Sequence, residues 1–377
     1  MNIVAICPNL SVKVSSFAEV PVYWGEKGHR VIVITCQQMD ALKGKWIFPE
    51  QEMLGNTSFY RPYKNLTELY HRQGIHYFSI KRMLIDFKPH IVFCSGRGNI
   101  KLSRMIKKEF NIPSVFLTEY ARDPFMLLSF KGKKYLQALN TGFLFKSYIG
   151  YYWRNLCRVF DAIMVSYHGD REYLDKLSYH GTEIHYAPWC NQIPELKKEN
   201  RERGMGIHIG GLFPFKNAQE LIKTIPLILE NTPTERFIVI GPGPIAKGIV
   251  RLKQRYTRHI EYIESLPRQE AISFLAKSFY AYTPVIKAGL GFIGDSWGVK
   301  TPLIATHDVG RFLRNREDTL ISQNVKSIDK VINELYNSEE LYNTLVNNGY
   351  QRYLRDHTKE AVGENYLRVF SSVIGKK

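Results

Sequence analysis

The stretch that decides the fold is Ile207-His208-Ile209-Gly210-Gly211-Leu212-Phe213-Pro214-Phe215-Lys216-Asn217-Ala218-Gln219-Glu220-Leu221-Ile222. It predicts a strand that ends in two glycines, a loop with one lysine, and a helix capped by Asn217. Glycines allow the backbone to approach a ligand closely, and the free amides of a helix N-terminus attract phosphate. Lys216 adds a positive charge to the same loop. The stretch therefore predicts a diphosphate-binding turn between a strand and a helix.

The same stretch also has a plainer interpretation. Parallel sheets contain many turns from strand to helix in which a lysine is solvated and no ligand binds. Taken alone, the stretch favours this plainer interpretation, so the choice depends on the rest of the chain.

Around this stretch, short apolar runs alternate with stretches of helical period, which is typical of parallel sheets covered by helices. A length of 377 residues suits two domains. The predicted strands are 2–7, 30–35, 90–94, 114–117 and 162–166 in the first half, and 206–210, 236–240, 259–263, 279–282 and 302–306 in the second. Each set predicts one doubly wound α/β sheet.

The two sets of strands are separated by a segment without apolar period. Residues 188–204 contain a run of charged side chains and predict a linker. We expect an N-terminal Rossmann-like domain over 1–190, which binds the acceptor, and a C-terminal Rossmann-like domain over 191–355, which binds the nucleotide. Residues 356–377 predict a last helix that packs back on the N-terminal domain.

Composition narrows the class of partner and the compartment. A formal charge of +17 and a pI near 9.5 favour a negatively charged partner, whether nucleic acid, anionic lipid or a phosphorylated substrate. The five cysteines form no C-x-x-C pair and predict thiols in a reducing compartment. The N-terminus resembles a first strand rather than a signal peptide, and no apolar run reaches the roughly 18 residues that span a bilayer. We expect a cytoplasmic protein.

Two further loops follow predicted strands of the second half. Ile240-Gly241-Pro242-Gly243-Pro244 brings glycine backbone to the carboxyl edge of the same sheet. Lys287-Ala288-Gly289-Leu290-Gly291-Phe292-Ile293-Gly294-Asp295 leads through glycines to a helix start with a single acid. A carboxylate accepts hydrogen bonds from ribose hydroxyls. The residues expected to contact the nucleotide in these loops are Gly241, Gly243, Leu290, Gly291 and Asp295.

With these motifs the chain resembles the retaining GT-B glycosyltransferases of the group 1 type, which transfer a sugar from a nucleotide donor without a metal. The resemblance is strongest over 207–306 and extends weakly over nearly the whole chain. It implies two Rossmann-like parallel-sheet domains that face each other across a cleft. It also implies a nucleotide-diphosphate sugar as donor, for which we expect UDP, with no metal and no further cofactor.

The family's second domain begins with a strand, Gly-Arg-Leu, and a loop that ends in Lys-Gly or Lys-Asn. The family's arginine and lysine hold the donor diphosphate. Here Gly210, Lys216 and Asn217 match this pattern, whereas Gly211 stands in place of the arginine. The family's Gly-x-Gly-Pro turn is matched by residues 241–244.

The family then has two glutamates with seven residues between them, followed by Gly-Thr-Pro-Val-Ile-Ala-Thr, which residues 301–306 match closely. Asp295 falls at the second glutamate and keeps a carboxylate, which implies ribose recognition. Lys287 falls at the first and reverses its charge. In one interpretation Lys287 replaces the cation that is missing at Gly211, and in the other the donor site has decayed.

The N-terminal half carries weaker resemblances. Ser15-Ser16 stand where the family has a Gly-Gly loop, and Tyr120 stands where it has a histidine near the transferred sugar. Tyrosine can hydrogen-bond a sugar hydroxyl but does not carry protons near neutral pH. In a retaining enzyme the donor phosphate can act as the base. The resemblance therefore implies Lys216, Lys287 and Tyr120 as the catalytic residues.

Residues 124–160 contain no carboxylate, and lysines and arginines alternate there with aromatic residues. This composition is typical of a surface that lies on anionic lipid, and it also fits single-stranded nucleic acid. A third interpretation is a pair of helices with the aromatic side chains in the core. Because many enzymes of this family take lipid-linked acceptors at the cytoplasmic membrane face, the resemblance favours lipid over nucleic acid.

The leading hypothesis is a metal-independent retaining hexosyltransferase of polysaccharide biosynthesis. It would move a sugar from a nucleotide-diphosphate sugar to a glycan or lipid-linked acceptor, in the cytoplasm or at the inner face of the membrane. The alternative is a GT-B-like protein without catalysis that binds a glycan or a partner through a decayed donor site.

Overall fold

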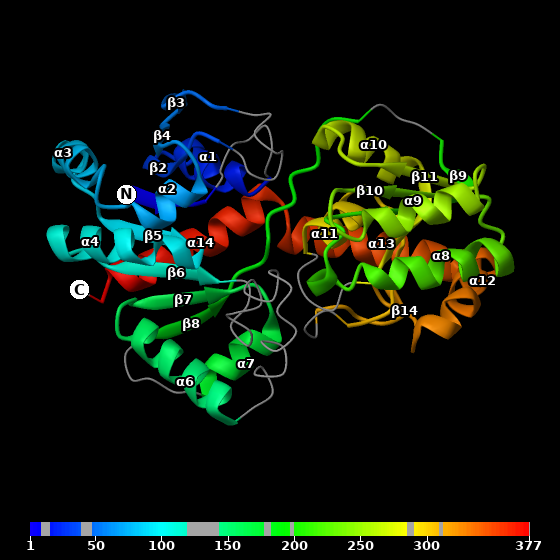
Figure 1. The fold of residues 1–377 in the computed structure, drawn as a ribbon. Coiled ribbons are helices and arrows are strands. Elements are labelled where there is room, and N and C mark those ends of the chain that lie inside the picture. Colours follow the sequence, from blue (N-terminus) through cyan, green and yellow to red (C-terminus); the bar gives the residue numbers. More distant parts are fainter. Residues whose placement is uncertain are drawn as a thin grey trace. The chain divides into compact units, whose positions relative to one another are not determined.

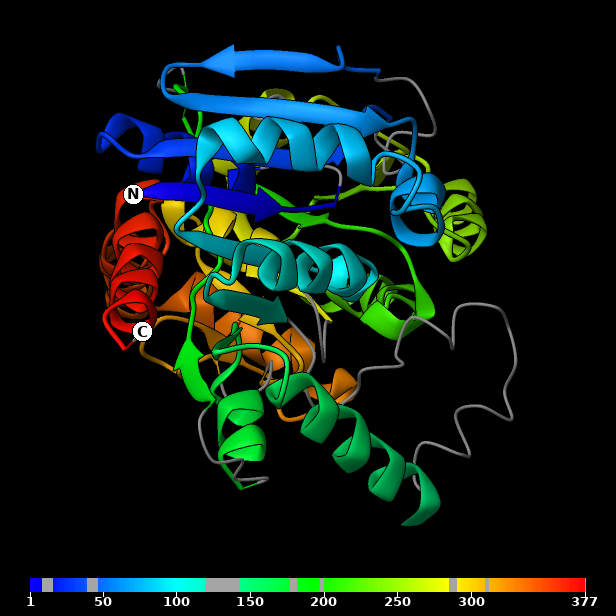
Figure 2. The ribbon, with the colours of Figure 1, turned by 90° about the vertical axis from the view of Figure 1, so that its left-hand side faces the viewer.

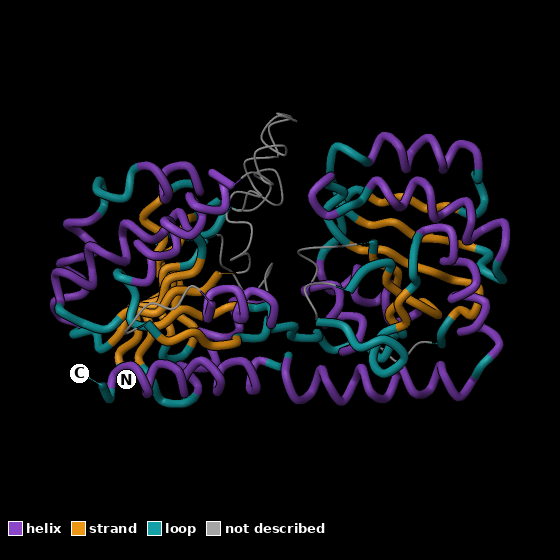
Figure 3. The backbone as a smooth tube through the Cα atoms, turned by 90° about the horizontal axis from the view of Figure 1, so that it is seen from below, coloured by secondary structure: helices purple, strands orange, loops and turns teal. Residues whose placement is uncertain are grey.

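The structure is a computed structural model that describes residues 1–8, 16–38, 47–118, 143–176, 182–196, 200–284, 290–308 and 312–376. The described chain divides into two compact units (Figure 1). Unit 1 comprises residues 1–118, 143–188 and 359–376, and unit 2 comprises residues 189–358. Each unit is a sheet of parallel strands with helices on both faces (Figure 3).

Unit 1 contains an eight-stranded sheet in the order β3-β4-β2-β1-β5-β6-β7-β8, parallel except for the edge pair β3 and β4. Its strands are β1 (Asn2–Ile6), β2 (Arg30–Cys36), β3 (Gln51–Leu54), β4 (Thr57–Tyr63), β5 (Ile91–Ser95), β6 (Ser114–Thr118), β7 (Ala162–Val165) and β8 (Glu183–Tyr186). Its helices are α1 (Glu19–Glu26), α2 (Leu66–His71), α3 (Tyr77–Phe87), α4 (Ile100–Phe110), α6 (Phe143–Cys157), α7 (His168–Lys176) and α14 (Lys359–Ile374).

Alternate residues of β5 show how the helices cover this sheet. Val92 and Cys94 belong to the cores that contain side chains of α3, α4 and α6. Phe93 points the other way, toward Trp24 of α1 and Phe370 of α14, with ring centroids 5.8 Å and 5.7 Å apart. Helices α3, α4 and α6 therefore cover one face of the sheet, and α1 and α14 cover the other.

The C-terminal helix α14 packs on α1 through specific contacts. The Tyr23 hydroxyl donates to Glu364 over 2.7 Å, and the Trp24 indole N–H donates to the carbonyl of Gly363 over 3.3 Å. A side chain at Gly363 would collide with the ring of Tyr23. The last helix of the sequence thus completes the core of the unit that contains the first strand.

Unit 2 contains a six-stranded parallel sheet in the order β11-β10-β9-β12-β13-β14. Its strands are β9 (Glu202–Ile209), β10 (Arg236–Ile240), β11 (Ile260–Ile263), β12 (Ser278–Thr283), β13 (Leu303–Ala305) and β14 (Leu320–Ile321). Its helices are α8 (Gln219–Asn231), α9 (Ala246–Arg255), α10 (Arg268–Lys277), α11 (Leu290–Gly298), α12 (Ile328–Asn337) and α13 (Glu339–Asp356).

All ten strands predicted from the sequence are present, with ends that differ by at most four residues. The prediction missed β3, β4, β8 and β14. Strand β4 was missed because the fully buried Arg61 and the adjacent Pro62 interrupt its apolar pattern. The predicted linker was too long, because Glu202 and Arg203 already belong to β9, where Arg203 bonds to the carbonyl of Tyr336.

Candidate functional site

The chain of unit 2 changes direction across its sheet between β9 and β12. From β9 the strands run outward through β10 and β11, and β12 then begins the other half of the sheet on the opposite side of β9. In open parallel sheets, ligands bind beyond the carboxyl ends of the strands at such a switch point. The loops after β9 and β10 meet at this edge, where β12 also ends. The sequence singles out the loops after these three strands.

The loops after β9 and β10 pack backbone against backbone. The amide of Gly210 donates to the carbonyl of Ile240 over 2.9 Å, and the amide of Leu212 donates to the carbonyl of Pro242 over 2.8 Å. Gly241 and Gly243 have φ values of 145° and 153°, which disfavour any side chain. A Cβ at either glycine would collide with the 210–212 backbone. These two glycines are therefore required by the loop itself, whether or not a ligand approaches them.

Gly211 has room for a side chain only if a neighbour moves. A Cβ at this position would lie 2.8 Å from the ring of Phe213. The ring occupies the direction in which the family's arginine would leave the backbone.

Lys216 and Asn217 form the turn between this loop and α8. Residues Pro214–Lys216 make a short 3₁₀ turn, and Asn217 follows in the left-handed conformation with φ 56°, which asparagine tolerates well. The Asn217 amide donates to the carbonyl of Pro284 over 3.1 Å and so joins this turn to the end of β12.

The expected capping role of Asn217 is wrong. The N-cap of α8 is Ala218, and no side chain caps this helix end, because Oδ1 of Asn217 accepts from the side-chain amide of Gln219 over 2.7 Å and not from a backbone amide of the helix. The backbone amides of Ala218, Glu220 and Leu221 already donate to backbone carbonyls, so this turn can stabilise an anion through Lys216 and the positive end of the helix dipole.

Three side chains that the sequence analysis did not assign to the nucleotide site lie beside this turn. Glu220, in the first turn of α8, accepts from the hydroxyl of Thr306 over 2.9 Å and pairs with Nε2 of His307 at 3.1 Å. Thr306 and His307 follow β13, so the contacts tie this edge to a fourth loop. Matching residues 301–306 to a family ending indicated Thr306, but no local pattern indicates that His307 meets Glu220.

His208 of β9 is buried directly beneath the glycine loop. Its Nδ1 hydrogen donates to the carbonyl of Tyr282 over 2.9 Å, and its ring meets Phe292 of α11 edge to face at 5.5 Å. Burial, with a smaller contribution from the charge of Lys216, lowers the pKa of His208 from 6.5 to about 4. The imidazole is therefore neutral at physiological pH, with Nε2 unprotonated on the side of Gly210.

Asp295 of α11 has partners within the protein. Its carboxylate accepts from Arg268 at both oxygens, over 2.8 Å and 2.7 Å, and from the amide of Asn191 over 3.0 Å. The Asp295 residue is only 7% exposed. A fork-to-fork pair of this kind fixes both side chains. The sequence analysis selected Asp295 but not Arg268 or Asn191, which no motif in the chain marks.

Of the other residues that the sequence analysis selected, the structure describes some and not others. Leu290 is buried at the start of α11. Gly291 has open space where a side chain would stand, and its carbonyl accepts from Asn191 over 2.6 Å. Lys287, Tyr120 and Ser15 lie outside the described residues.

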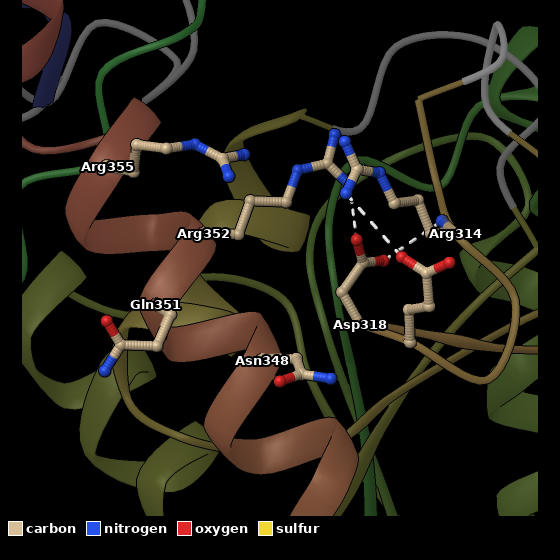
Figure 4. A pocket seen from close by; sticks show the side chains of 7 residues that line it. Arg314, Asp318, Asn348, Gln351, Arg352 and Arg355 are labelled. Atoms are coloured by element: carbon tan, nitrogen blue, oxygen red, sulfur yellow. Dashed lines mark hydrogen bonds and ion pairs between the residues drawn. The ribbon is translucent and has the colours of Figure 1, made fainter.

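Unit 2 also has a pocket of about 280 Å³ beside α13 (Figure 4). The residues that line it lie between positions 314 and 355 and belong to none of these loops. Three arginines line it, and each pairs with an acid: Arg352 with Asp318 at 2.6 Å, Arg314 with Glu317 at 3.6 Å and Arg355 with Asp356 at 2.6 Å. Its positive charge is thus already balanced within the protein. Among the described side chains, no group of three or more His, Cys, Asp or Glu residues could hold a metal ion.

Comparisons with known proteins agree with this architecture. No protein-family model matches the sequence, and no curated protein matches it. Among solved structures, the chain is similar to sucrose-phosphate synthase from Thermosynechococcus elongatus, with a TM-score of 0.76 and 13% identity over 100% of this chain and 99% of that one.

Two further structures match over almost their whole lengths. HepE from Anabaena, in complex with UDP and glucose, has a TM-score of 0.68 and 11% identity over 99% of this chain and 100% of that one. A UDP-forming trehalose-phosphate synthase from Burkholderia xenovorans has a TM-score of 0.66 and 11% identity over 99% of each chain. The expected GT-B fold, with two parallel-sheet α/β units, is confirmed.

Proposed function

We propose that this chain, which has the GT-B fold, is a glycosyltransferase that moves a sugar from a nucleotide-diphosphate sugar to a glycan or lipid-linked acceptor. The observation that carries the proposal is the turn at Lys216 and Asn217. This turn places a lysine and the uncapped N-terminus of α8 beside a glycine loop, at the switch point of the unit 2 sheet. A diphosphate leaving group needs fixed positive charge of this kind, supplied by the lysine and by the positive end of the helix dipole.

Several features support a uridine nucleotide as the donor. HepE was solved with UDP and glucose, and the Burkholderia synthase is described as UDP-forming. In the proposed site, the diphosphate lies against Lys216, Asn217 and the backbone of Gly210 and Gly211, and the nucleoside extends toward α11. The ribose role of Asp295 requires its carboxylate to keep or exchange the bonds to Arg268 and Asn191, so it stays a prediction.

The proposed reaction retains the anomeric configuration and uses no metal. Lys216 stabilises the charge that develops on the leaving diphosphate, and Lys287 supplies the second cation that Gly211 lacks. Tyr120 orients a sugar hydroxyl, and the donor phosphate takes the acceptor proton. The neutral His208 beneath the loop stiffens it and adds no further charge to the site.

The acceptor side of the proposal concerns location. No helix in the described part of the chain is long and apolar enough to cross a membrane. We propose that the protein acts in the cytoplasm, with residues 124–160 contributing to contact with the inner face of the membrane, in the biosynthesis of a polysaccharide. In α6, Trp153 is buried and Tyr151 is 63% exposed, so of these two aromatic residues one belongs to the core and the other to the surface.

A second candidate function is a binding protein without catalysis. The observation that favours it is the pair of Asp295 with Arg268, because a carboxylate held at both oxygens by an arginine has little capacity left for a ribose. The replacement of the family's arginine by Gly211 supports it as well.

The deciding experiment is calorimetric titration of the full chain with UDP, GDP and ADP in the presence of a chelator. We expect one nucleoside diphosphate to bind, and Lys216→Ala to weaken it by roughly 1.5–3 kcal/mol while uridine itself is hardly affected. Lys223→Ala is the matched control, because Lys223 is an exposed lysine on α8 away from the turn. If no nucleoside diphosphate binds, the function as a binding protein is favoured. If Lys216→Ala weakens the binding of UDP and uridine equally, Lys216 does not contact the diphosphate.

A further inference from the structure

Helices α3 and α4 of unit 1 form an exposed surface that is both basic and apolar. They lie side by side, because the hydroxyl of Tyr77 donates to the carbonyl of Met105 over 3.1 Å and Lys81 pairs with Glu109 at 2.6 Å. Both pack on the same face of the sheet, so their outer sides turn to solvent together (Figure 2). We call this outer side the α3–α4 surface.

The net charge of this surface is positive. Helices α3 and α4 contain six lysines and arginines and two acids, Asp86 and Glu109, and two of the lysines are paired: Lys81 with Glu109 and Lys107 with Asp161. Lys101, Arg104 and Lys108 are exposed at helical spacing along α4, and Arg82 is exposed on α3. Exposed Arg154 of α6 and Arg158, just after the end of this helix, have the same sign, and α6 covers the same face of the sheet.

Large apolar side chains stand among these charges. Ile75 is 61% exposed, Phe78 is 78% exposed and Ile85 is 53% exposed. Their spacing of three and seven residues puts them on one stripe of α3 and its preceding turn, with Arg82 between Phe78 and Ile85. Solvent-facing helices do not ordinarily gather such side chains unless a partner covers them.

We propose that the α3–α4 surface lies on an anionic lipid membrane, with Phe78, Ile75 and Ile85 inserted between the headgroups and the basic side chains at the phosphate level. The two parts are complementary to one such surface: apolar side chains enter the acyl boundary while lysine and arginine pair with lipid phosphates. Single-stranded nucleic acid fits less well, because isoleucine offers no ring on which a base can stack. The inference concerns unit 1 alone and holds whether or not the chain transfers a sugar.

The test is sedimentation of the full chain with vesicles of phosphatidylcholine mixed with phosphatidylglycerol, and with vesicles of phosphatidylcholine alone. We expect binding to the mixed vesicles only, and weaker binding as salt rises. The triple variant Lys101→Gln/Arg104→Gln/Lys108→Gln should bind roughly 100-fold more weakly, since each basic residue near an anionic surface contributes roughly fivefold. Phe78→Ser should bind roughly tenfold more weakly while keeping the charge.

The matched control is Arg251→Gln/Lys253→Gln/Arg258→Gln, which removes three exposed charges from unit 2. It should leave vesicle binding within about twofold of the original. Equal losses in the two triple variants would overturn the proposal, because binding would then follow net charge alone. Absence of vesicle binding would overturn it too. The proposal would also be overturned if the chain binds a single-stranded RNA oligonucleotide and not vesicles, and if the triple variant of α4 weakens that RNA binding.

A second readout does not depend on losing affinity. All five native cysteines are buried, so Phe78→Cys offers one accessible thiol for an environment-sensitive fluorophore. Its emission should shift to the blue when mixed vesicles are added, as expected for insertion into an apolar layer. The same label at Val250→Cys, on α9 of unit 2, should not shift. A label at position 78 that stays in water on vesicle-bound protein would contradict the insertion.

Discussion

At the scale of single residues, Asp295 of α11 and Arg268 of α10 form an ion pair that is largely buried in unit 2. The side chains are 10% and 26% exposed, and Asn191 donates a third bond to the same carboxylate. Removing one partner of a buried pair leaves the other charge uncompensated in a poorly solvated place. Together with Asn191, this pair connects the segment before β9 to α10 and α11. We therefore expect its loss to lower the stability of unit 2 more directly than it lowers nucleotide binding.

We therefore expect Asp295→Asn to lower the free energy of unfolding of unit 2 by about 2–4 kcal/mol. The same change should weaken the binding of UDP and 2′-deoxy-UDP equally, if Asp295 supports the loop rather than the ribose. Denaturant unfolding and calorimetry measure the two effects. Asp175→Asn, which breaks an exposed pair with Arg171, should cost less than about 1 kcal/mol. If Asp295→Asn weakens the binding of UDP more than that of 2′-deoxy-UDP, Asp295 contacts the ribose after all.

Gly211 and Lys287 are the residues on which the charge of the proposed donor site depends. If Lys287 supplies the cation that Gly211 lacks, Lys287→Glu should abolish UDP binding although it restores the family's residue. One opposite charge at contact distance is worth roughly 4 kcal/mol at an effective dielectric of 20. Gly211→Arg with Lys287→Glu should recover binding, provided that the ring of Phe213 moves aside to admit the new side chain.

A double-mutant cycle with UDP as ligand measures the coupling between these two positions. Lys326→Glu, which changes an exposed lysine of unit 2 by the same charge, serves as the control. Tighter binding by Lys287→Glu alone would contradict compensation and would indicate a decayed donor site.

At the scale of elements, the loops after β9 and β10 act as one unit because their backbones touch. Gly241→Ala should destabilise the protein by more than about 1 kcal/mol, since alanine disfavours the φ of 145° and its Cβ would collide with the carbonyl of Gly210. It should also weaken UDP binding by displacing the loop that precedes Lys216. Thermal unfolding and calorimetry on the same preparations report both effects.

Gly291 provides the matched glycine on a helix. Gly291→Ala meets nothing within 4 Å and should stabilise α11 by about 0.5–1 kcal/mol. If it weakens UDP binding while raising the unfolding temperature, a ligand approaches α11 at this position. A stable Gly241→Ala variant with unchanged UDP binding would show that the two loops move independently.

At the scale of the whole molecule, acid should destabilise the fold through two buried histidines of unit 2. Burial lowers the pKa of His208 and of His357 from 6.5 to about 4. Below pH 6.5 each histidine becomes protonated in the unfolded chain while it stays neutral in the folded chain. The stability that each neutral histidine contributes is therefore complete above pH 6.5 and is lost as the pH falls toward 4. The limiting slope is roughly 1.4 kcal/mol per pH unit for each histidine.

The variant His208→Asn/His357→Asn should flatten this slope in denaturant unfolding between those two pH values. Asparagine keeps a donor near Nδ1, which serves the carbonyls of Tyr282 and Trp189, but it does not titrate. His71→Asn, at an exposed position, should leave the slope as it was. An unchanged slope in the double variant would mean that other groups control the acid response.

The sequence by itself determined the elements whose signals are local. Apolar periods of two and 3.6 residues located ten strands, and the glycines after β9 and β10 located the edge at which the loops meet. Those signals are local because backbone conformation and the alternation of buried side chains depend on near neighbours in the chain. The short strand β14 lacks enough residues to show any period.

Only the tertiary structure decided which distant residues become partners. Arg268 lies 27 residues before Asp295, and Glu364 lies 341 residues after Tyr23, and neither pair has a signature in the sequence. The Asn217 amide likewise donates to the carbonyl of Pro284, which lies 67 residues further along the chain. A polar side chain can satisfy its hydrogen bonds with any group that folding brings near it. Its partner is therefore set by the packing of sheets and helices and not by its neighbours in the chain.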